Sequence, residues 1–486
     1  MHNQLRRRRA VPGVHELSDE SVLVVHPLRL YDLKRKQRCR SKTPMSYVDP
    51  FDADRWPRLT VTEKFISGLT GLATWFAVRL YGNALASRRT DTAAATNLGA
   101  GSAGIGASLL SSWIFFNIEY TKRLNKPESL ADPDSNFSRF CNLNVRWKER
   151  NPEPSSPNAS VARRRIILLH GFGASLFTFR NVMDELARKT GSNVEALDLP
   201  AFGLTSRSWS NHHYSLRSMA EVVGQFARMP ARQANDICLV GHSLGGLVAL
   251  QSVAQLPCAP RALILVSPAI YFRETKQRAR GIRRCLQTVL LPLRYALATV
   301  QVSFRFLTAQ ISRGISPVLR GLVRLVVSQE RLWRYGLRLA VEDRTLIRPD
   351  VIEGYRLPDR VRGWDRALLA FVLNRYQGVF SIKEFAQQVH RIAHGGTAED
   401  YTDLLQNLRK LSIPVLIIHG RDDRIVPLRN SQLLAQYLGC ELCIFDHCGH
   451  LPHEEMADRF IDCVERFIAQ IGTPSHSPRR AAVEAF

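Results

Sequence analysis

Six short apolar runs alternate with longer amphipathic segments between residues 166 and 445, and no other feature limits the fold as strongly. Each run ends in a loop rich in Gly, Pro or polar residues. Strands that are buried on both faces and separated by helices are typical of a mostly parallel sheet with helices on both sides. The sequence therefore predicts an α/β fold with strands at 166–169, 194–199, 237–240, 262–266, 415–418 and 442–445.

A serine stands between two glycines directly after the run at 237–240, in Gly241-His242-Ser243-Leu244-Gly245. Where a strand turns sharply into a helix, side chains two residues before and after the turn would collide, and glycine avoids this. Gly246 extends the small patch where the helix begins. The pattern predicts that Ser243 is a nucleophile at the tip of the turn.

A glycine-rich loop, His170-Gly171-Phe172-Gly173, follows the run at 166–169. Acyl transfer needs two backbone N–H donors for the oxyanion of its tetrahedral intermediate. We expect one donor from Leu244, the residue after the serine, and the other from Phe172. The structural alternative is a turn that only ends the strand.

Acidic and histidine-containing loops follow the last two runs. Asp422 and Asp423 lie after 415–418, and His450 lies after 442–445. A neutral histidine accepts the serine proton, and a buried carboxylate fixes the histidine tautomer and stabilises the imidazolium. The sequence predicts a catalytic set of Ser243, Asp423 and His450, in the chain order Ser, Asp, His. Asp422 is the alternative acid.

These motifs together resemble the α/β-hydrolase superfamily over residues 160–472. They are HGFG at 170–173, GHSLGG at 241–246, GRDDRIVP at 420–427 and CGH at 448–450. Within the superfamily pattern G-x-x-D-x-x-V-P, the matching acid is Asp423. PAFGLTSR at 200–207, with 351–355 and 363–365, is similar to plant, algal and cyanobacterial members, mostly of undefined substrate. The resemblance implies an α/β-hydrolase fold and a serine hydrolase.

Serine, histidine and aspartate in this arrangement serve many reactions, and a fold alone selects none of them. We expect hydrolysis of an ester-type bond in a small hydrophobic or lipid-like substrate, through an acyl-enzyme. One alternative is another Ser-His-Asp enzyme, such as a carbon–carbon bond hydrolase, a thioesterase or an acyltransferase. The other is a non-enzymatic, membrane-associated binding protein that keeps the fold.

About 145 residues with helical periodicity separate the fourth and fifth apolar runs, too many for a loop. We expect residues 271–411 to form a helical cap over the active site, inserted between core segments 151–270 and 412–474, with a disordered tail at 475–486. The insertion holds 25 Lys and Arg against 12 Asp and Glu. Its apolar stretch at 286–327, with arginines spaced along it, suits a helix on an anionic membrane surface. It suits equally a lid with arginine stems along its surface.

The first 150 residues lie outside the resemblance. Residues 1–60 are a basic leader that we expect to be poorly ordered, and 61–150 are an apolar, helical extension. The uncharged run at 97–118 is long enough to span a bilayer, but its Gly, Ala and Ser also fit a hairpin packed on the core. We expect a membrane-associated protein, in a chloroplast or another organelle, with a cytoplasmic protein as the alternative.

Three other kinds of ligand are not expected. Gly99-x-Gly101-x-x-Gly104 has the spacing of a dinucleotide loop but lacks the preceding strand and the acidic residue, so we expect no cofactor. Cys440 and Cys443 would point to opposite faces of a strand, so we expect no metal. The net charge of +24 permits nucleic-acid binding, but no recognised module is present, and none is expected.

Overall fold

The structure is a computed structural model that describes residues 22–25, 111, 113–114, 116–152, 164–229, 236–271, 291–377, 382–393 and 401–471. Contacts within the chain divide it into two units. One unit comprises Met1–Tyr31 and Leu124–Phe486, and the other comprises Asp32–Arg123. In the second unit, residues 116–122 are helical.

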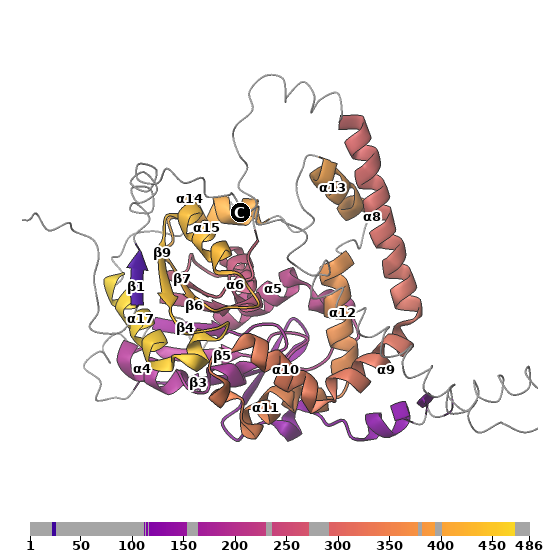
Figure 1. The fold of residues 1–486 in the computed structure, drawn as a ribbon, viewed down its shortest axis with the longest axis horizontal. Coiled ribbons are helices and arrows are strands. Elements are labelled where there is room, and N and C mark those ends of the chain that lie inside the picture. The colour runs from indigo at the N-terminus through magenta and orange to yellow at the C-terminus, as the bar shows by residue number, and fades with distance from the viewer. Residues whose placement is uncertain are drawn as a thin grey trace, which may run out of the picture. The chain divides into compact units, whose positions relative to one another are not determined.

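A nine-stranded sheet runs through the described part of the first unit, in the order β1-β9-β8-β7-β6-β4-β5-β3-β2 (Figure 1). The six strands from β9 to β5 are parallel, whereas β1, β3 and β2 are antiparallel to their neighbours. The strands are β1 (Val22–Val25), β2 (Asn136–Phe140), β3 (Leu143–Arg150), β4 (Arg164–Leu169), β5 (Asn193–Leu197), β6 (Asp236–His242), β7 (Ala262–Val266), β8 (Val415–Gly420) and β9 (Glu441–Phe445).

The six apolar runs of the sequence are the six parallel strands, so the predicted fold class is confirmed. Successive side chains along a strand point to opposite faces. In β4, Ile167 and Leu169 therefore enter one apolar cluster, while Ile166 and Leu168 enter another. Both clusters are buried, and this is why the runs are mostly apolar on both faces; Glu195 and Asp198, in the run at 194–199, are the buried exceptions.

Helices cover both faces of the sheet (Figure 1). Residues of α5, α6, α14 and α15 complete one apolar cluster, and residues of α4 and α17 complete the other. These helices, with the short α16, are α4 (Met183–Thr190), α5 (Leu216–Ala227), α6 (Leu244–Ser252), α14 (Thr402–Lys410), α15 (Leu428–Leu438), α16 (Pro452–Glu455) and α17 (Ala457–Gln470).

The segment between β7 and β8, called the insertion here, is helical wherever the structure describes regular secondary structure in it. Its helices before α14 are α8 (Leu291–Gly314), α9 (Ser316–Val327), α10 (Glu330–Ala340), α11 (Pro349–Arg356), α12 (Trp364–Gln377) and α13 (Ile382–Ala393). The last helix, α14, packs Leu405 and Leu408 into the core cluster on the sheet. The helical insertion predicted from periodicity is therefore present, and its end joins the core.

The sheet begins earlier in the chain than the predicted core boundary at residue 151. Strands β2 and β3 pair as a hairpin, and β3 pairs with β5. The turn residues Cys141 and Asn142 both have positive φ values, 49° and 61°, the combination of a two-residue hairpin turn. β1 likewise lies within the segment expected to be poorly ordered, and its backbone pairs with β9.

Among the helices that the described residues form, none combines the length and the apolar composition needed to cross a membrane. Most of the run at 97–118 lies outside the described residues, and the expectation for it stays a prediction.

A buried ion pair joins β4 to β5. The guanidinium of Arg165 donates to Glu195 Oε2 from Nη2 at 2.7 Å and from Nε at 3.0 Å, and to the carbonyl of Ala227 from Nη1 at 2.7 Å. Both side chains are almost completely buried, so each charge depends on the other for compensation.

Replacing Arg165 with Met should destabilise the protein by about 3–5 kcal/mol, because Glu195 would keep a buried charge without its partner. The double variant Arg165→Met/Glu195→Leu should recover most of this loss, since it leaves an apolar pair instead. Urea unfolding of the two variants measures both effects. A loss of less than about 1 kcal/mol in the free energy of unfolding of the single variant would show that Glu195 does not depend on Arg165 for compensation of its charge.

Candidate active site

Ser243 occupies a strained turn between β6 and α6. Its φ of 51° lies in the left-handed region, which costs a non-glycine residue about 1–3 kcal/mol and is often found at active sites. The Ser243 N–H donates to the carbonyl of Val266 on the neighbouring strand at 2.9 Å. The Ser243 carbonyl accepts from the N–H of Gly246 at 3.0 Å. These bonds hold the serine at the carboxyl end of β6, as the motif predicts.

The two flanking glycines are required because the backbone folds tightly onto itself and onto β4. A Cβ at Gly241 would lie 2.4 Å from the carbonyl oxygen of Gly245. A Cβ at Gly245 would lie 2.1 Å from the carbonyl oxygen of Leu169. Both distances are shorter than any side chain tolerates, so the G-x-S-x-G spacing follows from the shape of the turn.

His450 and Asp423 are joined by a hydrogen bond of 2.7 Å between Nδ1 and Oδ2. The other oxygen of Asp423 accepts from the backbone N–H groups of Ile425 and Val426 at 2.8 and 2.9 Å. Burial is the largest influence and acts to raise the pKa of Asp423, but the hydrogen bond from His450, the electrostatic effects of His450 and His419, and the Val426 N–H together lower this pKa below its usual value. Asp422 is exposed and lies outside this arrangement.

The bond to Asp423 assigns the proton of His450 to Nδ1, which leaves Nε2 as an acceptor. Ser243 and His450 are both almost buried, at 8% and 4% exposure. Within the described residues, the Ser243 hydroxyl makes no hydrogen bond to His450; without substrate such bonds are often long.

His242 connects the serine turn to the histidine loop. Its Nε2 lies 2.9 Å from the carbonyl oxygen of His450, and its ring lies 4.8 Å from the ring of His450. Because an imidazole N–H donates to this carbonyl, the residue next to Ser243 fixes the backbone of His450. Burial, together with the neighbouring histidines, lowers the pKa of His242 well below its usual value, so this donor is a neutral ring.

The loop after β4 lies against the serine. A Cβ on Gly171 would approach Ser243 Cβ to 3.2 Å and His242 Nδ1 to 2.9 Å. Within the described part of the chain, the backbone N–H groups of Phe172 and Leu244 donate no hydrogen bond. His170 fixes the loop, since its Nδ1 lies 2.8 Å from the Gly171 carbonyl oxygen and its Nε2 accepts from the Leu199 N–H at 3.0 Å.

Three phenylalanines form an apolar wall beside this loop. Phe172 is 55% exposed, and its ring lies 5.5 Å from that of Phe202 and 5.7 Å from that of Phe371. Phe202 follows β5, and Phe371 belongs to α12 of the insertion. The wall therefore combines core and insertion directly next to the expected oxyanion donor.

The insertion also contacts the histidine loop. The N–H of His450 donates to the carbonyl of Ala340, the last residue of α10, at 2.6 Å. Glu455 accepts from the N–H of Gly449 at 2.8 Å through one oxygen and from that of Glu342 at 2.6 Å through the other. One half-buried carboxylate thus joins the loop of His450 to the segment that follows α10.

Sequence reasoning missed two further histidines at the site. His419 lies on β8, with Nε2 3.3 Å from Asp423 Oδ2 and Nδ1 2.8 Å from Ser431 Oγ. His453 is completely buried, with its ring 4.7 Å from that of His242 and Nε2 2.8 Å from Thr178 Oγ1. A histidine at the end of an apolar run, directly before the predicted acid loop, was the available signal for His419. His453 has no comparable signal, because its partners are distant in the sequence.

A family model described as "Alpha/beta hydrolase family" matches residues 166–463, which is more than half of the chain. The chain belongs to the α/β-hydrolase family. This match spans the β4, β6, β8 and β9 loops that carry the residues described above, so the family assignment and the site geometry concern the same part of the chain.

Curated relatives of this α/β hydrolase are similar over most of their own length. An uncharacterized hydrolase, YugF, from Bacillus subtilis is 25% identical and matches over 63% of this chain and 90% of its own. A 2-hydroxymuconate semialdehyde hydrolase from Pseudomonas putida is 26% identical and matches over 63% of this chain and 86% of its own. A pimeloyl-[acyl-carrier protein] methyl ester esterase from Nitrosomonas europaea is 25% identical and matches over 62% of this chain and 94% of its own.

Among solved structures, a putative lipase from Acinetobacter baumannii is similar at 19% identity and a TM-score of 0.45, with 73% of this chain and 96% of that chain covered. The finer resemblance to plant, algal and cyanobacterial α/β hydrolases is not shown by these matches and stays a prediction.

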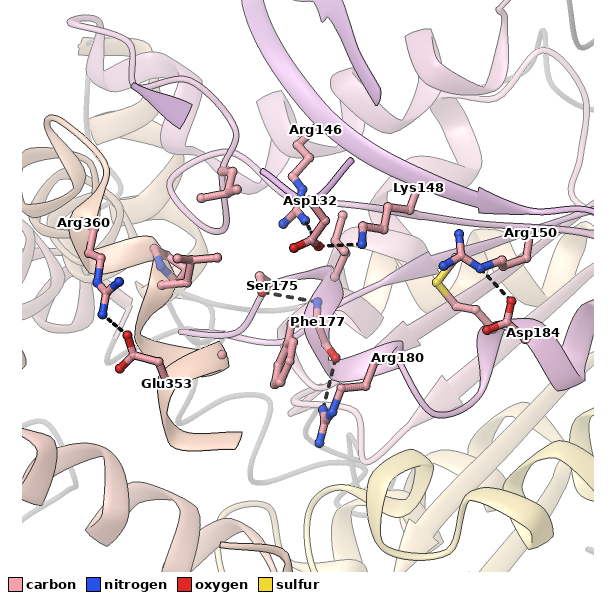
Figure 2. Close-up of a pocket in the computed structure, with 16 residues that line it drawn as sticks. Asp132, Arg146, Lys148, Arg150, Ser175, Phe177, Arg180, Asp184, Glu353 and Arg360 are labelled. Atoms are coloured by element: carbon pink, nitrogen blue, oxygen red, sulfur yellow. Dashed lines mark hydrogen bonds and ion pairs between the residues drawn. The ribbon is translucent and has the colours of Figure 1, made fainter. Parts of the chain in front are cut away.

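A cavity of about 410 Å³ lies elsewhere in the hydrolase, between β3, α4 and the insertion (Figure 2). Ser243, Asp423 and His450 do not line it. Its cations face carboxylates: Lys148 pairs with Asp132 at 2.6 Å, and Arg150 pairs with Asp184 at 2.6 Å. Each of the other described cations that line the cavity, Arg146, Arg180 and Arg360, also has a carboxylate partner.

Acid should destabilise the protein through its buried neutral histidines. Burial lowers the pKa of His453 to about 3, whereas an unfolded histidine titrates near pH 6.5. Between these values the unfolded state binds more protons, so the free energy of unfolding falls as the pH drops. We expect His453 to account for about 2 kcal/mol of this loss at pH 5.

Chemical unfolding of the wild type and His453→Gln between pH 7.5 and pH 4.5 measures this effect. The variant should be less stable at pH 7.5 and should lose less stability on acidification. Equal pH dependence in the two proteins would show that His453 takes up its proton in the folded state.

Proposed function

We propose that the chain is a serine hydrolase that cleaves an ester-type bond of a hydrophobic or lipid-like substrate through an acyl-enzyme at Ser243. The observation that carries the proposal is the convergence of three groups. A strained serine turn, a His450–Asp423 hydrogen bond and the glycine-rich loop at 170–173 all lie at the carboxyl ends of the parallel strands.

The proposed reaction has two halves, formation and hydrolysis of the acyl-enzyme, and the same groups act in both. Ser243 Oγ attacks the carbonyl carbon, and His450 Nε2 accepts its proton. Asp423 stabilises the imidazolium that forms, and the N–H groups of Phe172 and Leu244 bind the oxyanion of the tetrahedral intermediate. The alcohol leaves with the proton from His450. Water, activated by the same nitrogen, then hydrolyses the acyl-enzyme and restores Ser243.

The wall of Phe172, Phe202 and Phe371 supports an apolar acyl or alcohol group as substrate. Phe172 keeps more than half of its surface exposed although two aromatic neighbours pack on it. An exposed aromatic side chain beside the nucleophile gains free energy when an apolar group covers it. In this proposal the insertion is the cap that supplies part of the wall.

Carbon–carbon bond hydrolysis is the second candidate. Its support is the Pseudomonas putida relative named for 2-hydroxymuconate semialdehyde, at 26% identity. A panel of esters with increasing acyl length, assayed beside that semialdehyde, separates the two reactions. Turnover of the semialdehyde without turnover of any ester would replace the esterase proposal.

Ser243→Ala should abolish ester turnover and covalent labelling by a fluorophosphonate, because both need the serine oxygen as nucleophile. Mass spectrometry of the labelled wild type should place the adduct on the peptide that contains Ser243. Ser267→Ala is a matched control, since this buried serine also has a positive φ and follows a parallel strand. Labelling of the Ser243 variant at the wild-type rate would contradict the assignment.

Asp423→Asn should lower kcat by about 10³–10⁴-fold, because an amide favours the wrong tautomer of His450. Asp422→Asn, one residue away and exposed, should leave kcat nearly unchanged. Steady-state assays on a soluble ester measure both, and thermal unfolding checks that each variant is folded. The reverse order of the two effects would transfer the role of the acid to Asp422.

A further inference from the structure

Helix α8 of the insertion has one packed face and one open face. Ala298 and Val302 are buried against Val389 and Ala393 of α13. Figure 1 shows α8 as a long helix with α13 beside it. On the opposite side lies a stripe of exposed apolar residues, called the α8 stripe: Leu293, Leu297, Val300, Phe304, Leu307 and Ile311.

The stripe is continuous along the helix. Its members follow one another at steps of four, three, four, three and four residues, which places them on one face. Each is between 54% and 67% exposed. At a rise of about 1.5 Å per residue, the stripe is about 27 Å long. Single exposed apolar residues are ordinary on a protein surface, but an uninterrupted stripe of this length marks an interaction site.

The charge on α8 itself and on the following helix α9 has one sign. The sequence contains no Asp or Glu from residue 291 to residue 329. Arg294 and Arg305 lie about 100–120° around the helix from the centre of the stripe, on the same flank. Among the described residues, neither of them has an ion-pair partner, whereas Arg320 and Arg324 of α9 both pair with Asp365.

We propose that the α8 stripe is the surface by which this protein docks on an anionic lipid bilayer. The six apolar side chains enter the boundary between headgroups and acyl chains, and the flanking arginine stems extend to the lipid phosphates. A second copy of the chain is a poorer occupant. Two α8 helices would bring arginine flanks together without a carboxylate between them.

Flotation of the full chain with vesicles tests the proposal. The wild type should bind vesicles of phosphatidylcholine with phosphatidylglycerol more tightly than vesicles of phosphatidylcholine alone, and added salt should reduce the difference. Leu297→Gln/Phe304→Gln should weaken binding to both vesicle types by roughly tenfold or more. Arg294→Gln/Arg305→Gln should cost about thirtyfold on anionic vesicles and little on neutral ones.

Tyr335→Gln is the matched control for the stripe variant. Tyr335 is 61% exposed on α10 and lies off the stripe, so its replacement should leave vesicle binding unchanged. All variants should retain the wild-type unfolding midpoint and the wild-type turnover of a soluble ester, because none alters a residue placed at the site. Hydrogen exchange provides the local measurement: amides of 291–314 should gain protection when anionic vesicles are added.

Four results would overturn the proposal. In the first, the wild type does not float with vesicles of either kind. In the second, the stripe variant floats as the wild type does. In the third, vesicles protect the amides of another segment, such as 97–118, and leave the exchange of 291–314 unchanged. In the fourth, the wild type is a dimer that the stripe variant dissociates while vesicle binding is unaltered, and the stripe then covers a second copy. Loss of every ester activity would overturn the proposed function and leave the docking result unaffected.

Discussion

At the carboxyl ends of the parallel strands, the backbone segments approach so closely that only glycine fits between them. A Cβ on Gly245 would lie 2.1 Å from the carbonyl oxygen of Leu169, and one on Gly420 would lie 2.0 Å from that of Gly449. The first contact joins the serine turn to the loop after β4. The second joins the acid loop to the histidine loop. The two contacts therefore set the loops in two pairs, and the bond between His242 Nε2 and the carbonyl of His450 joins one pair to the other.

The same loops are also joined to the insertion through backbone atoms. The N–H of His450 donates to Ala340 at the end of α10, and its carbonyl lies 2.9 Å from Nε2 of His242 next to Ser243. The backbone of His450 is therefore held from the insertion on one side and from the serine turn on the other. A displacement of α10 would move the His450 backbone directly, so the insertion is part of the site's geometry and more than a cover for it.

The sequence was sufficient for the elements whose signal is local. Each parallel strand except β5, which contains Glu195, includes a continuous apolar run, and Ser243, Asp423 and His450 follow such runs at recognisable spacings. Strand β3 was not predicted, because Leu143, Val145 and Trp147 alternate with charged and polar residues and form no continuous apolar run. His419 lies four residues before Asp423 at the end of an apolar run, so its place beside the acid had a local signal that was not used. The role of His453 had no such signal, because its partner Thr178 is distant in the sequence and becomes a neighbour only in the folded chain.

The net charge of +24 can reflect either an arginine-rich surface without a specific role or a surface built for an anionic partner. The arrangement of the charges separates these two explanations. Around the cavity of Figure 2, cations face carboxylates, as in the pair of Lys148 with Asp132, so a high arginine content there leaves little net field. Along α8 the carboxylates are missing while the apolar residues are exposed. A general excess of arginine would not align six exposed apolar residues on one helix face, nor would it remove acids from the same forty-residue stretch. The two features occur together where a surface meets both acyl chains and phosphates.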